Sequence, residues 1–562
     1  MVEWNSVEWQ KLERRVFKLQ KRIYKASQRG DVKAVRKLQK TLVRSWSAKM
    51  LAVRRVTQDN QGKSTAGVDG IKKLTPKQRL ELIPKLKLNR KAKPTRRVWI
   101  PKPGTEEKRP LGIPTMYDRA LQALVKLVLE PEWEAHFEAN SYGFRPGRSC
   151  HDAIEAIYKA IKTSSKYVLD ADISKCFDRI NHKALLEKLN TFPTIRRQIR
   201  AWLQAGVMDG GQLFPTSEGT PQGGVISPLL ANIALHGLET EVMKAVNKGI
   251  TAQKGLTLVR YADDFVVLHK DLAVVQRCQQ IIVEWLKGMS LELKPSKTRL
   301  THTLNKYGTE SAGFDFLGFT IRQFPVGKHQ SGKNSNGKPL EFKTLIKPSQ
   351  KKVKLHIEKL RDIVRTHRGA NQEALISHIN PTIRGWSNYY STVVSKETFQ
   401  KVDNILYHQL VAWGKFRHPN KSCEWIARRY WLIQTEGWVF GSKKKGIKRM
   451  HLKTHQETPI VRHTKVQGGR SPYDGDFIYW STRMGRHPET NQRTATLLKR
   501  QNGKCAQCGL YFKEGDLLEL DHVNPKSKNG KDTLTNIQLL HRHCHDTKTT
   551  GDFKNPFSGK KS

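Results

Sequence analysis

Two adjacent aspartates near the middle of the chain stand between two short apolar runs. The tetrapeptide Tyr261-Ala-Asp-Asp264 follows Leu258-Val259 and precedes Phe265-Val-Val-Leu268, which predicts a β-hairpin with two carboxylates at its tip. Two acids at a turn are often only a solvated turn. Far upstream, however, Asp172 ends another apolar run. Phosphoryl transfer uses divalent cations about 3.5–4 Å apart, held by carboxylates on rigid neighbouring strands, and this set of acids suits that chemistry.

A second group of residues, at the C-terminal end, has the spacing of a zinc site. Cys505-x2-Cys508 and His541-x2-Cys544 are two knuckles that together supply four ligands for tetrahedral Zn²⁺. His543 competes with His541 for the fourth position. The remaining cysteines are scattered singly and are interpreted as reduced thiols rather than disulfides; they are Cys150, Cys176, Cys278 and Cys423.

Between the knuckles and directly after the second one lie residues suited to hydrolysing a phosphodiester. Asp521-His522, Asn536 and His545 resemble the HNH (ββα-metal) nucleases, whose chemistry needs a base for water and a divalent ion at the phosphate. By that resemblance His522 is the base, Asp521 and His545 bind Mg²⁺, and Asn536 holds the loop of His522. The alternative is a purely structural zinc module with incidental histidines.

The short sequence motifs around the central aspartates point to one family. In order along the chain they resemble group II intron-encoded proteins, which combine a reverse transcriptase, a splicing maturase and often an HNH nuclease. The motifs are Gly67-Val-Asp-Gly70, Ile100-Pro-Lys-Pro, Arg109-Pro-Leu-Gly-Ile-Pro114, Tyr142-Gly-Phe-Arg-Pro-Gly147, Pro221-Gln-Gly-Gly-Val-Ile-Ser-Pro228 and Phe316-Leu-Gly-Phe319. The resemblance makes Asp172, Asp263 and Asp264 the Mg²⁺-binding catalytic carboxylates of a reverse transcriptase palm.

The same resemblance assigns the nucleotide-binding residues. Phe177 falls where the family has the aromatic that excludes a 2′-hydroxyl, and Gln222 falls where it contacts the incoming dNTP. Lys102 and Arg109 lie in the fingers, where cations meet the triphosphate. An ordinary core phenylalanine remains the alternative for Phe177, and a surface cation the alternative for Lys102, Arg109 and Lys297. Asp170 and Asp178 are interpreted as structural.

One aromatic and basic stretch is a candidate for binding RNA. Asn380 to Tyr390 contains Arg384, Trp386 and Tyr389, which can stack on bases and contact phosphates. In the family this stretch belongs to domain X, the thumb-like part that binds intron RNA. A helical core with a polar rim explains the pattern equally well. The basic strip that follows, with Lys443-Lys-Lys445 and Arg449, takes the place of the family's DNA-binding segment.

These features predict a multidomain α+β protein. It has right-hand polymerase fingers and palm with an antiparallel sheet, an α-helical thumb, a basic DNA-binding segment and a small ββα-metal zinc domain. The stretch 325–337, rich in Gly, Lys, Ser and Asn, is expected to be a long loop or a domain boundary. The expected units are a basic helical N-terminal extension (1–64), fingers and palm (65–330), thumb or domain X (331–415), DNA-binding region (416–490) and nuclease (491–562).

The charge balance supports nucleic-acid partners. The 562 residues include 101 Lys and Arg against 50 Asp and Glu, a formal net charge of +51, which favours a polyanionic partner. The expected partners are intron RNA, target double-stranded DNA and dNTPs. With no secretory signal and no apolar run long enough for a bilayer, we expect no membrane contact and a cytoplasmic, nucleoid-associated location. A pure splicing maturase and a stand-alone retron-type enzyme remain alternatives.

Overall fold

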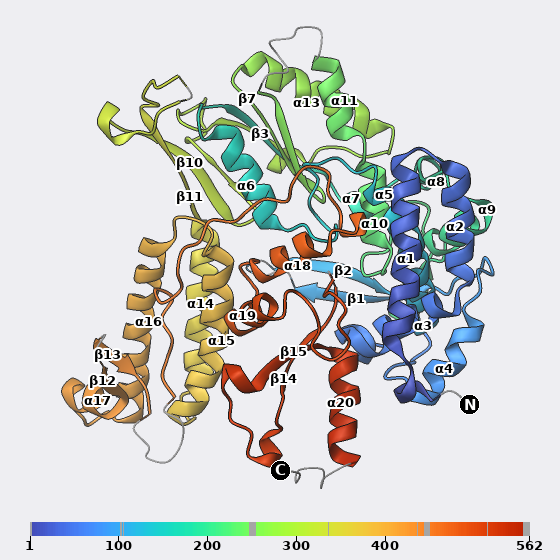
Figure 1. The fold of residues 1–562 in the computed structure, drawn as a ribbon. Coiled ribbons are helices and arrows are strands. Elements are labelled where there is room, and N and C mark those ends of the chain that lie inside the picture. The colour runs from blue at the N-terminus through green and yellow to red at the C-terminus, as the bar shows by residue number, and fades with distance from the viewer. Residues whose placement is uncertain are drawn as a thin grey trace.

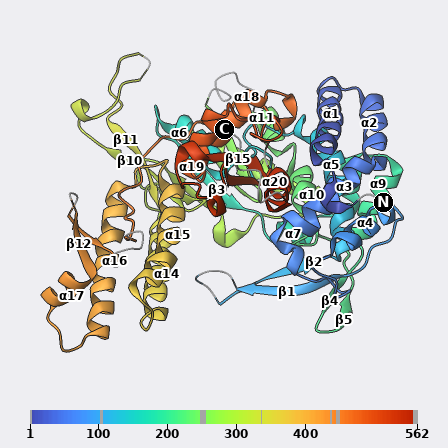
Figure 2. The ribbon, with the colours of Figure 1, turned by 60° about the horizontal axis from the view of Figure 1, so that its bottom comes forward.

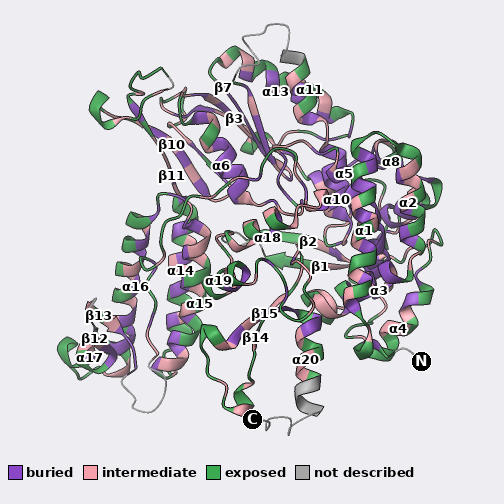
Figure 3. Ribbon diagram, in the orientation of Figure 1, coloured by how far each residue is buried: buried purple, intermediate pink, exposed green. Residues whose placement is uncertain are grey.

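The computed structural model describes residues 3–101, 104, 106–246, 255–334, 336–434, 437–442, 450–513 and 515–554. Within them, four buried hydrophobic clusters form the core of the N-terminal helices and palm, the palm–thumb junction, the thumb and the C-terminal module. Figure 1 shows how these parts are arranged, and Figure 3 shows that the buried residues gather where elements meet. The predicted roles of Lys102, Lys443–Lys445 and Arg449 fall on residues outside those described. No helix in the described part has the length and apolar character to cross a bilayer.

The N-terminal region is helical, as predicted. The apolar seams of its helices bury Leu12, Val16 and Ile23 of α1 and Val35 and Leu42 of α2, and the helices pack on the almost fully buried α5. The elements are η1 (Trp4–Ser6), α1 (Trp9–Gln28), α2 (Val32–Arg44), α3 (Trp46–Arg54), the π-helical η2 (Arg55–Asp59), η3 (Gln61–Ser64), α4 (Pro76–Lys85) and α5 (Met116–Glu134).

A four-stranded fingers sheet, ordered β2-β1-β4-β5, extends from these helices toward the thumb (Figure 2). At the tip of its long hairpin, a Cβ on Gly104 would lie 3.0 Å from Leu355 of the first thumb helix, so fingers and thumb meet there. The strands are β1 (Thr95–Pro101), β2 (Lys108–Ile113), β4 (Val207–Asp209) and β5 (Gln212–Phe214).

The palm is an antiparallel sheet of order β6-β7-β3-β8. Its strands are β3 (Tyr167–Asp172), β6 (Thr257–Tyr261), β7 (Asp264–His269) and β8 (Arg299–His302), and its helices are α6 (Cys150–Ile161), α7 (Cys176–Arg179), α8 (His182–Leu189), α9 (Pro193–Leu203), α10 (Ser227–Leu235), α11 (Leu238–Val246), α13 (Leu272–Lys287) and η4 (Pro295–Lys297). The three strands predicted from apolar runs are confirmed as β3, β6 and β7.

The stretch predicted as a long loop or domain boundary is the connection of a second sheet, ordered β11-β10-β9. β10 and β11 pair along seven residues, from Phe319 opposite Pro348 to Pro325 opposite Phe342. The predicted limit at residue 330 therefore falls within one hairpin, and the thumb begins after β11. The elements are β9 (Phe314–Phe316), β10 (Phe319–Pro325), η5 (Lys328–Gln330) and β11 (Phe342–Pro348).

Beyond this sheet the chain forms the helical thumb and then returns to the palm. The thumb consists of α14 (Gln350–Thr366), α15 (Gln372–Tyr390), α16 (Lys396–Arg417), α17 (Cys423–Tyr430), β12 (Trp431–Gln434) and β13 (Gly437–Phe440). Residues 450–470, which we call the strap, run without regular secondary structure from the thumb across the palm (Figure 1). Leu452 and Val466 of the strap are buried in the thumb and palm–thumb clusters, so this segment is fixed by packing.

The C-terminal module lies between the thumb and the N-terminal helices (Figures 1 and 2). It also contacts α1, because Gln10 Nε2 donates to the Cys508 carbonyl at 2.8 Å and His543 Nδ1 lies 3.6 Å from Glu13. Its elements are η6 (Pro472–Asp474), α18 (Phe477–Gly485), α19 (Gln492–Arg500), β14 (Leu518–His522), η7 (Lys526–Lys528), η8 (Leu534–Asn536), β15 (Ile537–His541) and α20 (Arg542–Lys554).

The turn between β6 and β7 leans on the loop that precedes α6. A Cβ on Gly143 would lie 2.4 Å from the Ala262 nitrogen and 2.9 Å from the Tyr261 carbonyl carbon, so only glycine allows this approach. The loop is anchored beneath by Arg145, which forms a fully buried bidentate pair with Glu134 at 2.9 and 3.0 Å.

Replacing Gly143 by alanine is therefore expected to displace the β6–β7 turn and to lower any activity of its carboxylates by about a hundredfold, because misplacement by about an ångström has that effect. The measurement is primer extension on an RNA template. Gly327→Ala is the matched control, since a Cβ there meets nothing within 4 Å. Parental extension by the Gly143→Ala protein would refute this account of the turn.

Candidate active sites

The palm sheet brings the three predicted carboxylates to one end. Asp172 ends β3 and stands opposite Asp264, the first residue of β7. Asp263 occupies the turn just before it, after Ala262 in the left-handed region at φ 59°. The Asp263 carbonyl accepts a hydrogen bond from the Ile173 nitrogen at 3.3 Å, which ties the turn to the end of β3.

This cluster carries more negative charge than its surroundings favour. Burial, followed by repulsion from Asp263 and Asp172, raises the pKa of Asp264 to about 7. Burial also raises the pKa of Asp263. Lys297 is a cation in contact with the group, its Nζ 2.5 Å from Asp172 Oδ2. Hard divalent cations prefer such carboxylates on rigid strands, and the unfavourable charge of the cluster fits cation binding.

Three of the residues assigned to the nucleotide, Phe177, Gln222 and Arg109, are among the described residues. Phe177 is half-buried and meets Phe144 edge to face at 6.0 Å, so its ring is partly accessible. Gln222 Nε2 donates to the Asp178 carboxylate at 3.2 and 3.3 Å. The exposed Arg109 on β2 is close enough to lower the pKa of Asp263, although burial dominates and raises it.

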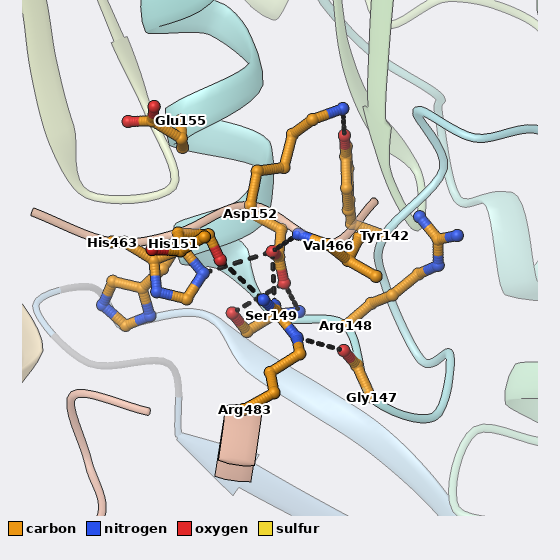
Figure 4. A network of polar contacts seen from close by, with 12 residues as sticks. Tyr142, Gly147, Arg148, Ser149, His151, Asp152, Glu155, His463, Val466 and Arg483 are labelled. Carbon is orange, nitrogen blue, oxygen red and sulfur yellow. Dashed lines mark hydrogen bonds and ion pairs between the residues drawn. The ribbon is translucent and has the colours of Figure 1, made fainter. Parts of the chain in front are cut away.

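A buried polar network supports the loop before α6 (Figure 4). Its hub, Asp152 near the start of α6, accepts hydrogen bonds from His463 Nε2 at 3.1 Å, from the Val466 nitrogen at 2.8 Å and from Arg483. Burial alone would raise the pKa of Asp152, but these donors hold it well below its ordinary value. Part of the region predicted to bind DNA thus packs on the polymerase.

In the C-terminal module, the two knuckles converge. One ligand atom each from Cys505, Cys508, His541 and Cys544 lies within 4.8 Å of all the others, the single such group found among the described residues. His541 Nδ1 is 3.4 Å from Cys508 Sγ, and its Nε2 is 3.4 Å from Asp516. A carboxylate behind a ligating histidine is usual at metal sites, so the group fits a tetrahedral zinc ion. His543 instead faces Glu13.

The hairpin of the module presents the predicted nuclease residues. β14 and β15 pair from Leu518 opposite His541 to His522 opposite Ile537, and α20 follows, a ββα unit. Asp521 Oδ1 and His545 Nε2 are 3.9 Å apart, within reach of one cation with ligand bonds of roughly 2.1 Å. The Asn536 side chain forms two hydrogen bonds with the backbone of Asn524, which lies just beyond His522. Its Oδ1 accepts one from the Asn524 nitrogen at 2.9 Å, and its Nδ2 donates one to the Asn524 carbonyl at 3.0 Å.

Sequence reasoning overlooked two further residues at this site. Lys548 Nζ contacts Asp521 Oδ2 at 3.0 Å and donates to the His522 carbonyl at 2.8 Å. Asp532 accepts from His522 Nε2 at 3.2 Å. Lys548 follows His545 by three residues on a helix. The spacing alone could therefore have placed both side chains on the same face. Asp532 lies in a loop, where spacing carries no such information.

The aromatic stretch of α15 is used largely for packing. Trp386 stacks on His356 with ring centroids 4.3 Å apart, and Tyr389 stacks on Phe319 at 5.4 Å. These contacts join the thumb helices to each other and to β10, which favours the helical-core interpretation for both aromatics. Arg384 is exposed and remains the member of this set open to RNA.

Comparison with known proteins adds family information to this geometry. Four families match the chain: the N-terminal domain of reverse transcriptase (residues 4–86), reverse transcriptase or RNA-dependent DNA polymerase (100–321), the group II intron maturase-specific domain (353–431) and HNH endonuclease (505–551).

Individual proteins are similar to parts of the chain. Protein YkfC of Escherichia coli is 32% identical over 292 residues, covering 44% of this chain and 75% of YkfC. The group II intron-encoded protein LtrA of Lactococcus lactis is 41% identical over 154 residues, 27% of this chain and 26% of LtrA. An uncharacterized 91 kDa protein in the cob intron of Schizosaccharomyces pombe is 28% identical over 370 residues, 54% of this chain and 44% of that protein.

The palm carboxylates, the helical thumb and the zinc-knuckle ββα module thus belong to a reverse transcriptase joined to an HNH endonuclease. With the maturase domain between them, the chain belongs to the family of group II intron-encoded proteins. Its domains are those of an RNA-directed DNA polymerase, a maturase and a DNA endonuclease.

The ligand geometry separates the two histidines that compete for zinc. His541→Ala and Cys505→Ser are expected to lose the metal, because each removes one of four ligands. His543→Ala is the matched control and should retain about one zinc per chain. Elemental analysis of the purified full-length proteins measures this. Zinc retained by His541→Ala but lost from His543→Ala would reverse the assignment.

Proposed function

We propose that the protein acts with a group II intron RNA as a ribonucleoprotein that assists splicing, nicks target DNA and copies the intron RNA from the nick. The convergence of Asp172 with Asp263 and Asp264 at one end of the palm sheet, on a chain that also carries the ββα nuclease hairpin, is the observation that carries this proposal. Both chemistries act on phosphate groups, and both need divalent cations, Mg²⁺ in the proposal.

In the polymerase reaction the primer 3′-oxygen attacks the α-phosphorus of a dNTP. A new P–O bond forms, the bond to pyrophosphate breaks, and the 3′-hydroxyl proton is lost. Asp172, Asp263 and Asp264 would hold the divalent cations that stabilise the charge on the attacking and leaving oxygens. Arg109 would bind the triphosphate through its positive charge. Gln222 would orient the nucleotide, and the Phe177 ring would fill the space that a 2′-hydroxyl needs.

In the nuclease reaction a water oxygen bonds to phosphorus as the P–O3′ bond breaks. His522 would accept the proton of that water, and solvent would protonate the leaving 3′-oxygen. Asp521 and His545 would hold the divalent cation at the phosphate, and Asn536 would keep the His522 loop in place. The zinc ion, held by Cys505, Cys508, His541 and Cys544, would stabilise the small module.

RNA binding is proposed for the N-terminal helices and the exposed side of the thumb. A groove of about 860 Å³ between α1, α2 and α3 carries cations from α1 and α2 and the exposed Trp46 at the start of α3; its basic residues are Arg15, Lys18, Lys37, Lys40 and Arg44. Cations with an aromatic surface suit a phosphate backbone and its bases. On the thumb, Arg384 is the residue proposed to contact RNA, with Trp386 and Tyr389 supporting the helix that presents it.

Asp263→Asn should reduce DNA synthesis on an RNA template by about a thousandfold or more, since a metal-binding carboxylate stabilises transition-state charge. Splicing assistance at low Mg²⁺ and DNA nicking should persist, because neither uses this carboxylate. The readouts are primer extension, splicing rate against protein concentration, and plasmid nicking. Normal cDNA synthesis would refute the palm assignment, and lost splicing with normal RNA binding would refute separability.

Phe177→Val should lower discrimination against ribonucleotides by about 10- to 100-fold, because the missing ring leaves room for a 2′-hydroxyl. Competitive incorporation of dNTP and rNTP measures the ratio, with dNTP incorporation as the internal control. If the ratio is unchanged while extension is normal, Phe177 serves only the core against which it packs.

A further inference from the structure

The proposed base of the nuclease is held by an acidic partner from a neighbouring loop. His522 Nε2 lies 3.2 Å from Asp532 Oδ1. On its other side, Asp532 faces Arg493 of α19, whose Nη1 is 3.4 Å from both carboxylate oxygens. The three side chains thus form a row from helix to loop to strand end.

Hydrogen bonds from two side chains hold the backbone on both sides of Asp532. Asn536 Nδ2 donates to the Lys531 carbonyl at 2.9 Å, next to Asp532, as well as to the Asn524 carbonyl. Arg500 of α19 donates to the Leu534 carbonyl at 2.5 Å. The asparagine therefore joins the two ends of the loop between His522 and β15, and α19 braces the loop from outside.

We propose that Asp532 is a positioning residue of the nuclease, which fixes the ring orientation and tautomer of His522. A carboxylate that accepts from Nε2–H leaves the proton on that nitrogen and the lone pair on Nδ1, where a base must receive the proton of water. When His522 takes the proton, the negative charge of Asp532 stabilises the imidazolium. Arg493 holds the carboxylate in the orientation that this requires.

This inference rests on the proposed role of His522 and adds to it. The hydrogen bonds and ion pairs of Asp532 among the described residues go to His522 and Arg493, not to the cation ligands Asp521 and His545 or to the zinc ligands. Removal of Asp532 should therefore affect the rate of the chemical step rather than metal content or DNA affinity.

The test uses full-length protein reconstituted with its intron RNA, and a supercoiled plasmid carrying the ligated exons that flank the intron. Asp532→Asn should lower the single-turnover nicking rate by about 10- to 100-fold, since a general base contributes roughly 10²–10⁴-fold. The DNA concentration at half-maximal rate, the zinc content and cDNA synthesis should not change. Asp532→Glu should retain more activity than Asp532→Asn, and Glu489→Gln, at an exposed acid near the start of α19, should match the parent.

A double-mutant comparison separates positioning from general destabilisation. In a His522→Ala background, adding Asp532→Asn should change the residual rate by less than about twofold, because the two residues act as a unit. An Asp532→Asn protein that nicks normally overturns the inference, as does an equal further loss in the His522→Ala background. If His522→Ala itself nicks normally, the proposed nuclease function fails instead.

Discussion

The mutual repulsion of three carboxylates at the end of the palm sheet is the constraint on which the polymerase depends. Burial and repulsion make this cluster unfavourable for the free protein, as the raised pKa values of Asp263 and Asp264 show. Such a group persists only where the surrounding structure holds it. Strand pairing aligns Asp172 with Asp264, and the Gly143 loop supports the turn from behind. The Arg145–Glu134 pair and the Asp152 network then hold that loop.

That support comes from distant parts of the chain. The strap and α18 reach Asp152 through His463, Val466 and Arg483, although these residues follow the thumb in sequence. The palm is therefore completed by the segment that leads to the nuclease. The two chemistries are separate in their reacting residues, but they share a connecting structure.

The local parts of this arrangement could be predicted from sequence, and the long-range parts could not. The two apolar runs that flank Asp263 and Asp264 predict a hairpin, and the spacing of Cys505 and Cys508 predicts half of a metal site. Trp386 shows the limit, because a base-stacking surface and a helical core have the same composition and spacing. The contacts of Asp152 and Asp532 depend on how loops fold back, which no periodicity encodes. The limit predicted at residue 330 lies inside the β10–β11 hairpin for a related reason, since a polar hairpin connection has the composition of a linker.

The contact between α1 and the C-terminal module has a consequence for how proteins of this kind can be recombined. Gln10 and Glu13 lie near the beginning of the chain, while the Cys508 carbonyl and His543 that they meet lie near its end. A chimera that takes its polymerase from one relative and its nuclease from another would join two surfaces that have not been selected together. Matching them requires exchanging the first helix along with the last module, so the natural unit of exchange is discontinuous in the gene.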